Sequence, residues 1–153
     1  MKFVLLFSLI LQTTAPVNSP FTEKERSLYS QKHSFGDRME FFDDVVARYR
    51  REFDAYNRRK DFEGFITFLD SYGHLLKIID EDVREMPGDK KGKSKALRKL
   101  EIQLRKSKED LQSFKPNAGA EQQTVFESAI TQSESVRTRM LQIIFGKDFL
   151  KDK

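Results

Sequence analysis

The segment from Asp61 to Met86 carries the most apolar surface of any part of this sequence, and it constrains the fold more than any other feature. Its main apolar residues recur at intervals of three and four, which is the spacing of one face of an α-helix. They are Phe62, Phe65, Leu69, Tyr72, Leu76, Ile79, Val83 and Met86. A second seam, formed by Phe68, Leu75 and Ile78, widens the apolar stripe beyond what contact with one neighbouring helix requires. We therefore predict a central helix that two or more partners cover.

Helix-start signals predict how the chain enters this central helix. Asp37, with Glu40 three residues on, matches the pattern of an N-cap and its reciprocal acceptor, and it predicts a preceding amphipathic helix that continues to about Tyr56. Asp61 is then the expected N-cap of the central helix, across a tight polar turn. A single helix that continues through residues 57–61 with local overwinding is the alternative.

Two further helices are expected in the C-terminal half of the chain. Pro87 and Gly88 should end the central helix, because proline cannot continue it and glycine accepts the backbone geometry found after a helix end. Apolar residues at heptad spacing predict a helix from about Ser94 to Phe114. After a turn that contains a proline, the same spacing predicts a last helix, which ends at Phe145.

The composition agrees with a protein built from long helices. Charged residues make up 34% of the chain and hydrophobic residues 38%, and no segment alternates apolar and polar residues with the period of two that strands require. Short connections favour antiparallel neighbours. We therefore predict an all-α fold, an antiparallel up-down four-helix bundle over residues 37–146. A long two-hairpin antiparallel coiled coil is the alternative.

The N-terminus resembles a secretory signal peptide, since Met1 and Lys2 precede an apolar run over residues 3–11 and then a polar stretch with small residues. That run is too short to span a bilayer, which takes roughly 20 residues. We predict a signal peptide at residues 1–19. The cut site is left open, because a proline directly follows each candidate, Ala15 and Ser19. The expected location is secreted or periplasmic, with no transmembrane span in the mature chain.

The segments that flank the predicted bundle carry weaker signals. Residues 20–36 are predicted to be mostly linker, although Thr22 and Glu25 match a capping box that would start a short helix over about residues 23–31. Residues 147–153 are predicted to be a C-terminal tail.

The most conspicuous charge feature lies between residues 90 and 108, where nine basic residues stand against Glu101 alone. Five of the basic residues form a candidate anion-binding stripe on the outward side of the predicted helix: Lys95, Arg98, Lys99, Arg105 and Lys106. Such a stripe could bind an acidic glycan, an anionic lipid surface or nucleic acid. The acidic residues at positions 80–85 should lie next to it across one short loop, however, so we expect the two clusters to neutralise each other in part.

The residues that usually carry catalysis or bind metals are scarce. The chain has no cysteine, which excludes disulfides, thiolate zinc sites and cysteine nucleophiles. Neither His33 nor His74 follows a glutamate by three residues, as di-iron bundles require. Asp70 and His74 are one helical turn apart, but the predicted register directs both outward and favours a solvated pair. With no hydrolase, phosphate-binding or zinc-protease motif, we expect no catalytic residue, no metal site and no cofactor.

These observations favour an exported, non-enzymatic helical-bundle protein that acts as a structural or protein-interaction module of the cell envelope or secreted space. Its predicted association surface is the second seam, Phe68, Leu75 and Ile78, which would contact an unknown protein partner or a second copy of the chain. The alternative is an anion-binding module that uses the basic stripe at residues 90–108. An enzyme would need a polar pocket that this sequence does not supply.

Overall fold

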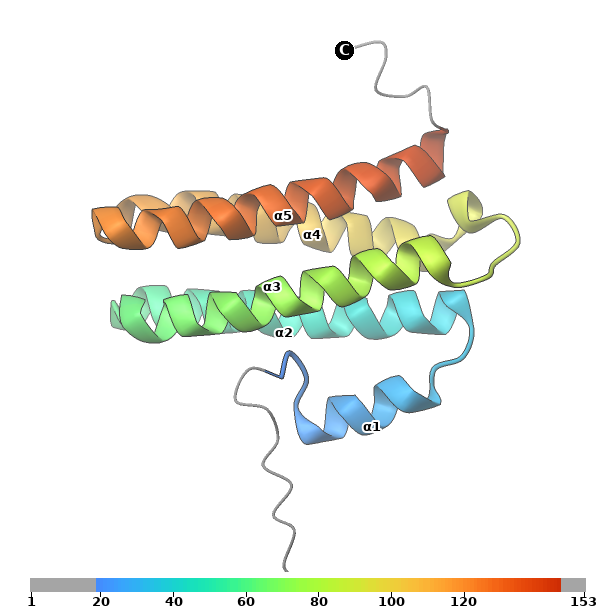
Figure 1. The fold of residues 1–153 in the computed structure, drawn as a ribbon, viewed down its shortest axis with the longest axis horizontal. Coiled ribbons are helices and arrows are strands. Elements are labelled where there is room, and N and C mark those ends of the chain that lie inside the picture. The colour runs from blue at the N-terminus through green and yellow to red at the C-terminus, as the bar shows by residue number, and fades with distance from the viewer. Residues whose placement is uncertain (1–18, 147–153) are drawn as a thin grey trace, which may run out of the picture.

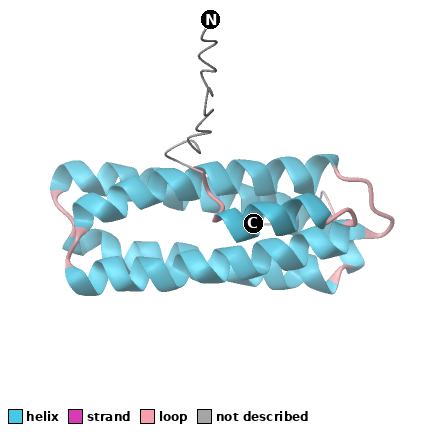
Figure 2. Cartoon of the chain, turned by 90° about the horizontal axis from the view of Figure 1, so that it is seen from below, coloured by secondary structure: helices cyan, strands magenta, loops and turns pink. Residues whose placement is uncertain are grey.

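The computed structural model of the protein describes residues 19–146, and this part of the chain is all-α. Figure 2 shows helices joined by loops, with no strand among the described residues. Five α-helices and two short 3-10 turns follow one another along the chain: α1 (Glu23–Gln31), α2 (Phe35–Arg59), α3 (Phe62–Glu85), η1 (Lys91–Lys93), α4 (Lys95–Phe114), η2 (Lys115–Asn117) and α5 (Ala120–Phe145). The prediction of an all-α helical bundle is confirmed.

The four long helices form two antiparallel hairpins, α2 with α3 and α4 with α5, which pack side by side (Figure 1). The hairpins are stacked so that α2 lies along α4. These two helices run in the same direction, because Arg50 contacts Asp110 and, further along the chain from both, Asn57 contacts Asn117 of η2, which directly follows α4. Chain direction thus alternates from one long helix to the next, although two of the packed pairs are parallel.

The helices α3 and α5 also lie side by side and parallel. Phe65 packs against Phe126 near their N-terminal ends, and Asp80 pairs with Arg139 near their C-terminal ends. Consequently α3 and α4 occupy opposite corners of the bundle although they are consecutive in the chain. The expectation that the short connection makes these two helices neighbours is wrong, because residues 86–94 can span roughly 30 Å when extended and can cross the end of the bundle.

The turn between α2 and α3 confirms one predicted cap. Lys60 adopts the left-handed backbone conformation (φ 54°), which ends α2, and Asp61 then accepts a hydrogen bond from the Gly64 N–H at 3.0 Å. The alternative of one continuous helix is therefore wrong. The next long helix, α4, begins at Lys95, close to the predicted start at about Ser94, and the Ser94 hydroxyl caps it by accepting a hydrogen bond from the Leu97 N–H at 3.2 Å.

The prediction of Asp37 as the N-cap of α2 is wrong by three residues. Ser34 is the N-cap, and its Oγ accepts a hydrogen bond from the Asp37 N–H at 3.1 Å. Both residues have side chains that can cap a helix, so the local sequence allows either start. The earlier start places the Phe35 side chain in the core, where only 7% of its surface is exposed. Burial of this ring therefore explains the choice of cap.

The centre of the bundle holds a small polar cluster within an aromatic and aliphatic core. The Tyr72 hydroxyl is hydrogen-bonded to Ser107 Oγ at 2.6 Å and lies 3.3 Å from Ser133 Oγ, which itself donates to the Ala129 carbonyl oxygen at 2.9 Å. Burial raises the pKa of Tyr72 to about 12, more than its hydrogen bonds lower it. The cluster joins α3, α4 and α5 at one level, which favours a single register between the hairpins.

The N-terminal segment is folded onto the bundle, so the prediction that residues 20–36 are mostly linker is wrong. The predicted short helix is present as α1, and both hydrogen bonds of its capping box, between Thr22 and Glu25, are formed. Phe21, just before it, is buried and stacks on Tyr29 with the ring centres 5.1 Å apart. Figure 1 shows α1 lying against the α2–α3 hairpin, away from α4 and α5.

Two predicted segments fall outside the described part of the chain. They are the signal peptide, apart from Ser19, and the tail at residues 147–153. Within residues 19–146, no helix is both long enough and apolar enough to cross a membrane.

Candidate anion-binding surface

The five candidate residues Lys95, Arg98, Lys99, Arg105 and Lys106 are all exposed on one side of α4, and together they are called the basic face below. The opposite side of α4 buries leucines at heptad spacing in the core: Leu97, Leu100, Leu104 and Leu111. Because this apolar stripe must face the core, the charged side must face outward.

Ile102 lies in the middle of the basic face, and the sequence prediction missed it. With about 100° of rotation per residue, all five basic residues lie within about 60° of Ile102 around the helix axis. Its side chain is 40% exposed, although isoleucine is among the residues most often buried. The signal was present in the sequence, as an isoleucine at an outward heptad position between basic residues.

The two seams that border the basic face are occupied by interactions between helices. On the α5 side, Lys108 pairs with Glu134 at 2.8 Å and Glu101 pairs with Arg137 at 2.6 Å. On the α2 side, Arg50 pairs with Asp110 at 2.7 Å. The charges at both edges of α4 are therefore matched within the bundle.

The basic face itself is not matched in this way. Within residues 19–146, the side chains of Lys95, Lys99, Arg105 and Lys106 form no hydrogen bond and no ion pair. Arg98 donates one hydrogen bond, to the Gly92 carbonyl oxygen at 3.4 Å. The bundle thus presents five cations on three turns of one helix.

The predicted neutralisation of this face by the acidic end of α3 is wrong. Asp80 pairs with Arg139 of α5 at 2.5 Å, and Asp82 pairs with Arg38 of α2 at 3.0 Å. The reason is the diagonal placement of α3 and α4, which puts α2 and α5, rather than α4, next to the acidic residues.

An acidic group of α2, Asp43, borders the basic face and forms no ion pair within residues 19–146. Burial and the neighbouring Asp44 carboxylate raise the pKa of Asp43 more than Lys99 and Lys106 lower it. Among the described residues, no donor bonds Asp43 Oδ1, which is buried. Asp43 therefore weakens the positive potential of this edge, but among the described residues it forms no ion pair with a cation of the basic face.

The predicted association surface is covered within the monomer. Leu75 is fully buried, while Phe68 and Ile78 are half-buried and pack against the core. The Phe68 ring stacks on Tyr49 of α2 with the ring centres 4.6 Å apart. The second seam of α3 thus packs against the core of the same chain, and its three side chains do not form an exposed surface for self-association.

The N-terminal segment contacts two polar residues on the same face of α3 as this seam. Ser71 donates a hydrogen bond to the Ser19 carbonyl oxygen at 3.4 Å, and Asp82 accepts one from the Tyr29 hydroxyl at 3.0 Å. Ser71 and Asp82 share the helical face of Phe68, Leu75 and Ile78, because these five residues recur at intervals of three and four. The N-terminal segment therefore lies close to this face of α3 at two points.

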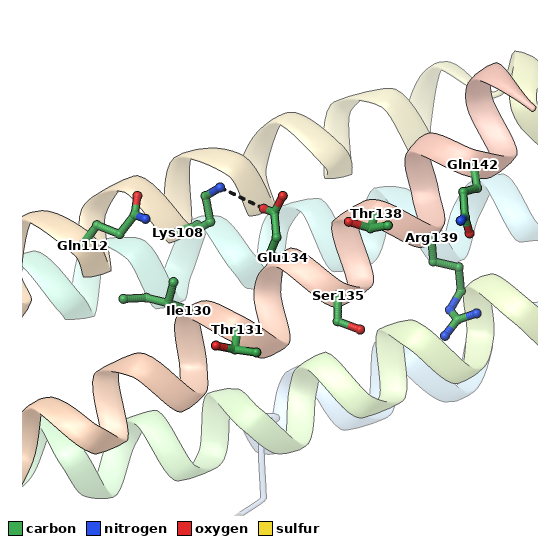
Figure 3. Close-up of a pocket in the computed structure, with 9 residues that line it drawn as sticks. All are labelled: Lys108, Gln112, Ile130, Thr131, Glu134, Ser135, Thr138, Arg139 and Gln142. Atoms are coloured by element: carbon green, nitrogen blue, oxygen red, sulfur yellow. Dashed lines mark hydrogen bonds and ion pairs between the residues drawn. The ribbon is translucent and has the colours of Figure 1, made fainter. Parts of the chain in front are cut away.

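An open groove with a volume of about 610 Å³ lies between α4 and α5 (Figure 3). Its wall carries the Lys108–Glu134 ion pair, and Arg139 extends from α5 toward α3, where it pairs with Asp80. The charged groups of this groove are therefore already paired with one another or with α3. The groove offers no charge that is left for a ligand.

A smaller groove of about 270 Å³ between α3 and α5 contains Asp70 and His74. Asp70 is exposed as predicted, but His74 is half-buried, because α5 lies across that side of α3. Asp70 supplies the one carboxylate and His74 the one imidazole among the described residues that line it. Across residues 19–146, no group of three or more histidine, aspartate or glutamate side chains is placed to hold a metal ion. We assign no catalytic role to this groove.

Comparison of the chain with protein-family models, with curated proteins and with solved structures found no match.

Proposed function

We propose that this protein is an exported, non-enzymatic helical module that acts by contact, and that it binds a polyanion through the basic face of α4. One observation carries the proposal: five exposed cations on one side of a rigid helix form no ion pair within residues 19–146. The proposed secreted or periplasmic location rests on the resemblance of residues 1–19 to a signal peptide.

Electrostatic repulsion among the cations of the basic face favours the binding of a polyanion. Like charges one turn apart on a helix, such as Lys95 and Lys99, repel each other and destabilise it by a few tenths of a kcal/mol per pair. A polyanion relieves this repulsion, and the release of its condensed counterions adds a favourable entropy. The packed bundle also holds the backbone of α4 in place, so binding does not have to order it.

The sequence places the contact role at the second seam of α3, whose side chains are buried or half-buried and pack against the core. The basic face is the alternative contact surface, and its five cations form no ion pair within residues 19–146. The proposal therefore unites the two expectations: a module that acts by contact, with an anionic partner and α4 as the contact surface.

Retention on immobilised heparin tests this proposal. We expect the full chain to be retained and to elute at a salt concentration that falls sharply for Lys95→Glu with Arg105→Glu. Neither side chain forms an ion pair among the described residues, and glutamate in the first turn suits the helix dipole, so the variant should fold. The number of released ions, read from the salt dependence of binding, should fall by about two.

The matched control is Lys24→Glu with Lys77→Glu, which changes the net charge equally on α1 and α3, away from the basic face. Its elution should stay close to that of the unmodified protein. An equal shift for both variants would mean that retention reflects net charge alone, and this result would overturn the proposal, as would failure of the unmodified protein to bind.

A further inference from the structure

Three large hydrophobic side chains are exposed among residues 19–146, and two of them accompany the basic residues. Ile102 is 40% exposed at the centre of the basic face, and Phe145 is 59% exposed at the end of α5. The third, Leu28, is 38% exposed on α1, on the other side of the bundle (Figure 1). Apolar surface and positive charge therefore occur together in one region of the molecule.

The end of α5 lies next to η1, which directly precedes the basic face in the chain. A Cβ atom on Gly92 would be 2.4 Å from the Ile143 carbonyl oxygen, so η1 and the last turn of α5 are in direct contact. Phe145 is two residues beyond Ile143, and the exposed Lys93 follows Gly92. This end of the bundle thus combines an exposed aromatic ring with further positive charge.

The combination of positive charge and apolar surface favours one class of anionic partner over the others. A polysaccharide or nucleic acid gains little from an aliphatic side chain such as Ile102, because its binding depends on charge, hydrogen bonds and stacking on aromatic rings. A lipid interface gains from both: lysine and arginine reach the headgroups with their charged ends, while an apolar side chain enters the acyl boundary. Anionic lipids add an attraction for each basic residue.

We propose that the partner of the basic face is the surface of an anionic lipid bilayer, with α4 lying along it and Ile102 entering the interface. This inference rests on the proposed function, since it names the polyanion that the same face binds. The basic face extends about 17 Å along the outer side of α4, from Lys95 to Lys106, which suits an extended surface.

Cosedimentation with lipid vesicles tests the inference. We expect the full chain to bind vesicles of phosphatidylcholine with phosphatidylglycerol, and not vesicles of phosphatidylcholine alone. The Lys95→Glu with Arg105→Glu variant should lose at least about 30-fold in partitioning. Ile102→Ser should lose about three- to tenfold, while the matched control Leu28→Ser should bind like the unmodified protein.

Insertion of position 102 into the lipid interface can be observed by fluorescence. Because the chain has no tryptophan, a single introduced tryptophan is the only one that emits. Fluorescence emission of an Ile102→Trp variant should shift to shorter wavelength when anionic vesicles are added, and that of Leu28→Trp should not. An unshifted Ile102→Trp emission in the presence of bound vesicles would overturn the inference. Binding to heparin without binding to anionic vesicles would also overturn it and would leave the proposed function standing, with a glycan or nucleic acid as partner. Failure to bind either would remove both.

Discussion

Asp43 shows how a single residue can oppose both the stability of the fold and the proposed function. Its carboxylate lies at the α2–α4 seam, and among the described residues nothing donates a hydrogen bond to its buried Oδ1. Burial and Asp44 raise its pKa, even though Lys99 and Lys106 lie near enough to lower it. A carboxyl whose pKa is raised by folding is a destabilising charge near neutral pH.

We therefore expect Asp43→Asn to raise the free energy of unfolding by about 0.5 to 1 kcal/mol near neutral pH. The gain should disappear below the ordinary carboxyl pKa of 3.8, because Asp43 is then protonated in both the folded and the unfolded chain. Urea denaturation at the two pH values measures this. The exposed neighbour is the control, since Asp44→Asn should change the unfolding free energy by less. Destabilisation by Asp43→Asn near neutral pH would contradict the argument.

At the scale of elements, α1 is attached to the bundle by the aromatic contacts of Phe21 and Tyr29 with Phe41 of α2 and by polar contacts. Arg48 of α2 donates to both carboxylate oxygens of Glu25, at 2.6 and 2.8 Å, and also to the Pro20 carbonyl oxygen at 3.0 Å. Burial raises the pKa of Glu25, but the hydrogen bonds from Arg48 and Thr22 lower it by more. The contribution of Glu25 is thus present above its ordinary pKa of 4.5 and is lost as the pH falls through its lower pKa in the folded protein.

We expect Glu25→Gln to loosen α1 while the four long helices stay packed. Glutamine can keep the capping box, so the variant removes the charge beside Arg48 and costs about 1 to 2 kcal/mol of local stability. Amide hydrogen exchange should become faster in α1 and stay unchanged in α4 and α5. Glu23→Gln, in the same first turn but exposed, is the matched control. Unchanged exchange in α1 would show that the aromatic contacts of Phe21 and Tyr29 suffice to hold it.

For the whole molecule, the connection between α3 and α4 decides the arrangement. It crosses from one corner of the bundle to the opposite corner and brings η1 against the end of α5. Gly92 makes the contact, since a Cβ atom there would be 2.4 Å from the Ile143 carbonyl oxygen. Only glycine permits so close an approach of two backbone segments.

Gly92→Ala should accordingly lower the free energy of unfolding by about 1 to 3 kcal/mol, because a backbone segment must move to make room. Thermal or urea denaturation measures the loss. Gly36→Ala is the matched control, since a Cβ atom there meets nothing within 4 Å. That variant should keep or slightly increase stability, because alanine favours the helix. Equal stability of the two variants would argue against the close packing of η1 on α5.

Local features of the sequence predicted most of the secondary structure. Helical spacing located the four long helices, and Asp61 was recognised as a cap because a cap depends on residues within one turn. The start of α2 was misplaced because Ser34 and Asp37 are equivalent locally, and burial of Phe35 decides between them. The two weak signals at Thr22 and Glu25 did mark a real helix, but its docking on the bundle depends on Arg48, distant in the chain.

The candidate site divides in the same way. The five cations and their outward direction follow from the heptad pattern of α4, which the amino-acid order alone contains. The absence of ion pairs to these cations among the described residues does not follow from that pattern, because it depends on which helices lie beside the acidic end of α3. Ion pairs between residues that are dozens of positions apart depend on how the apolar faces of the helices pack. The wide apolar stripe of α3 is compatible with more than one set of neighbouring helices. The amino-acid order thus determined the helices and the charge they carry, whereas packing decided that Asp80 and Asp82 are neutralised by Arg139 and Arg38 and that the basic face stays open.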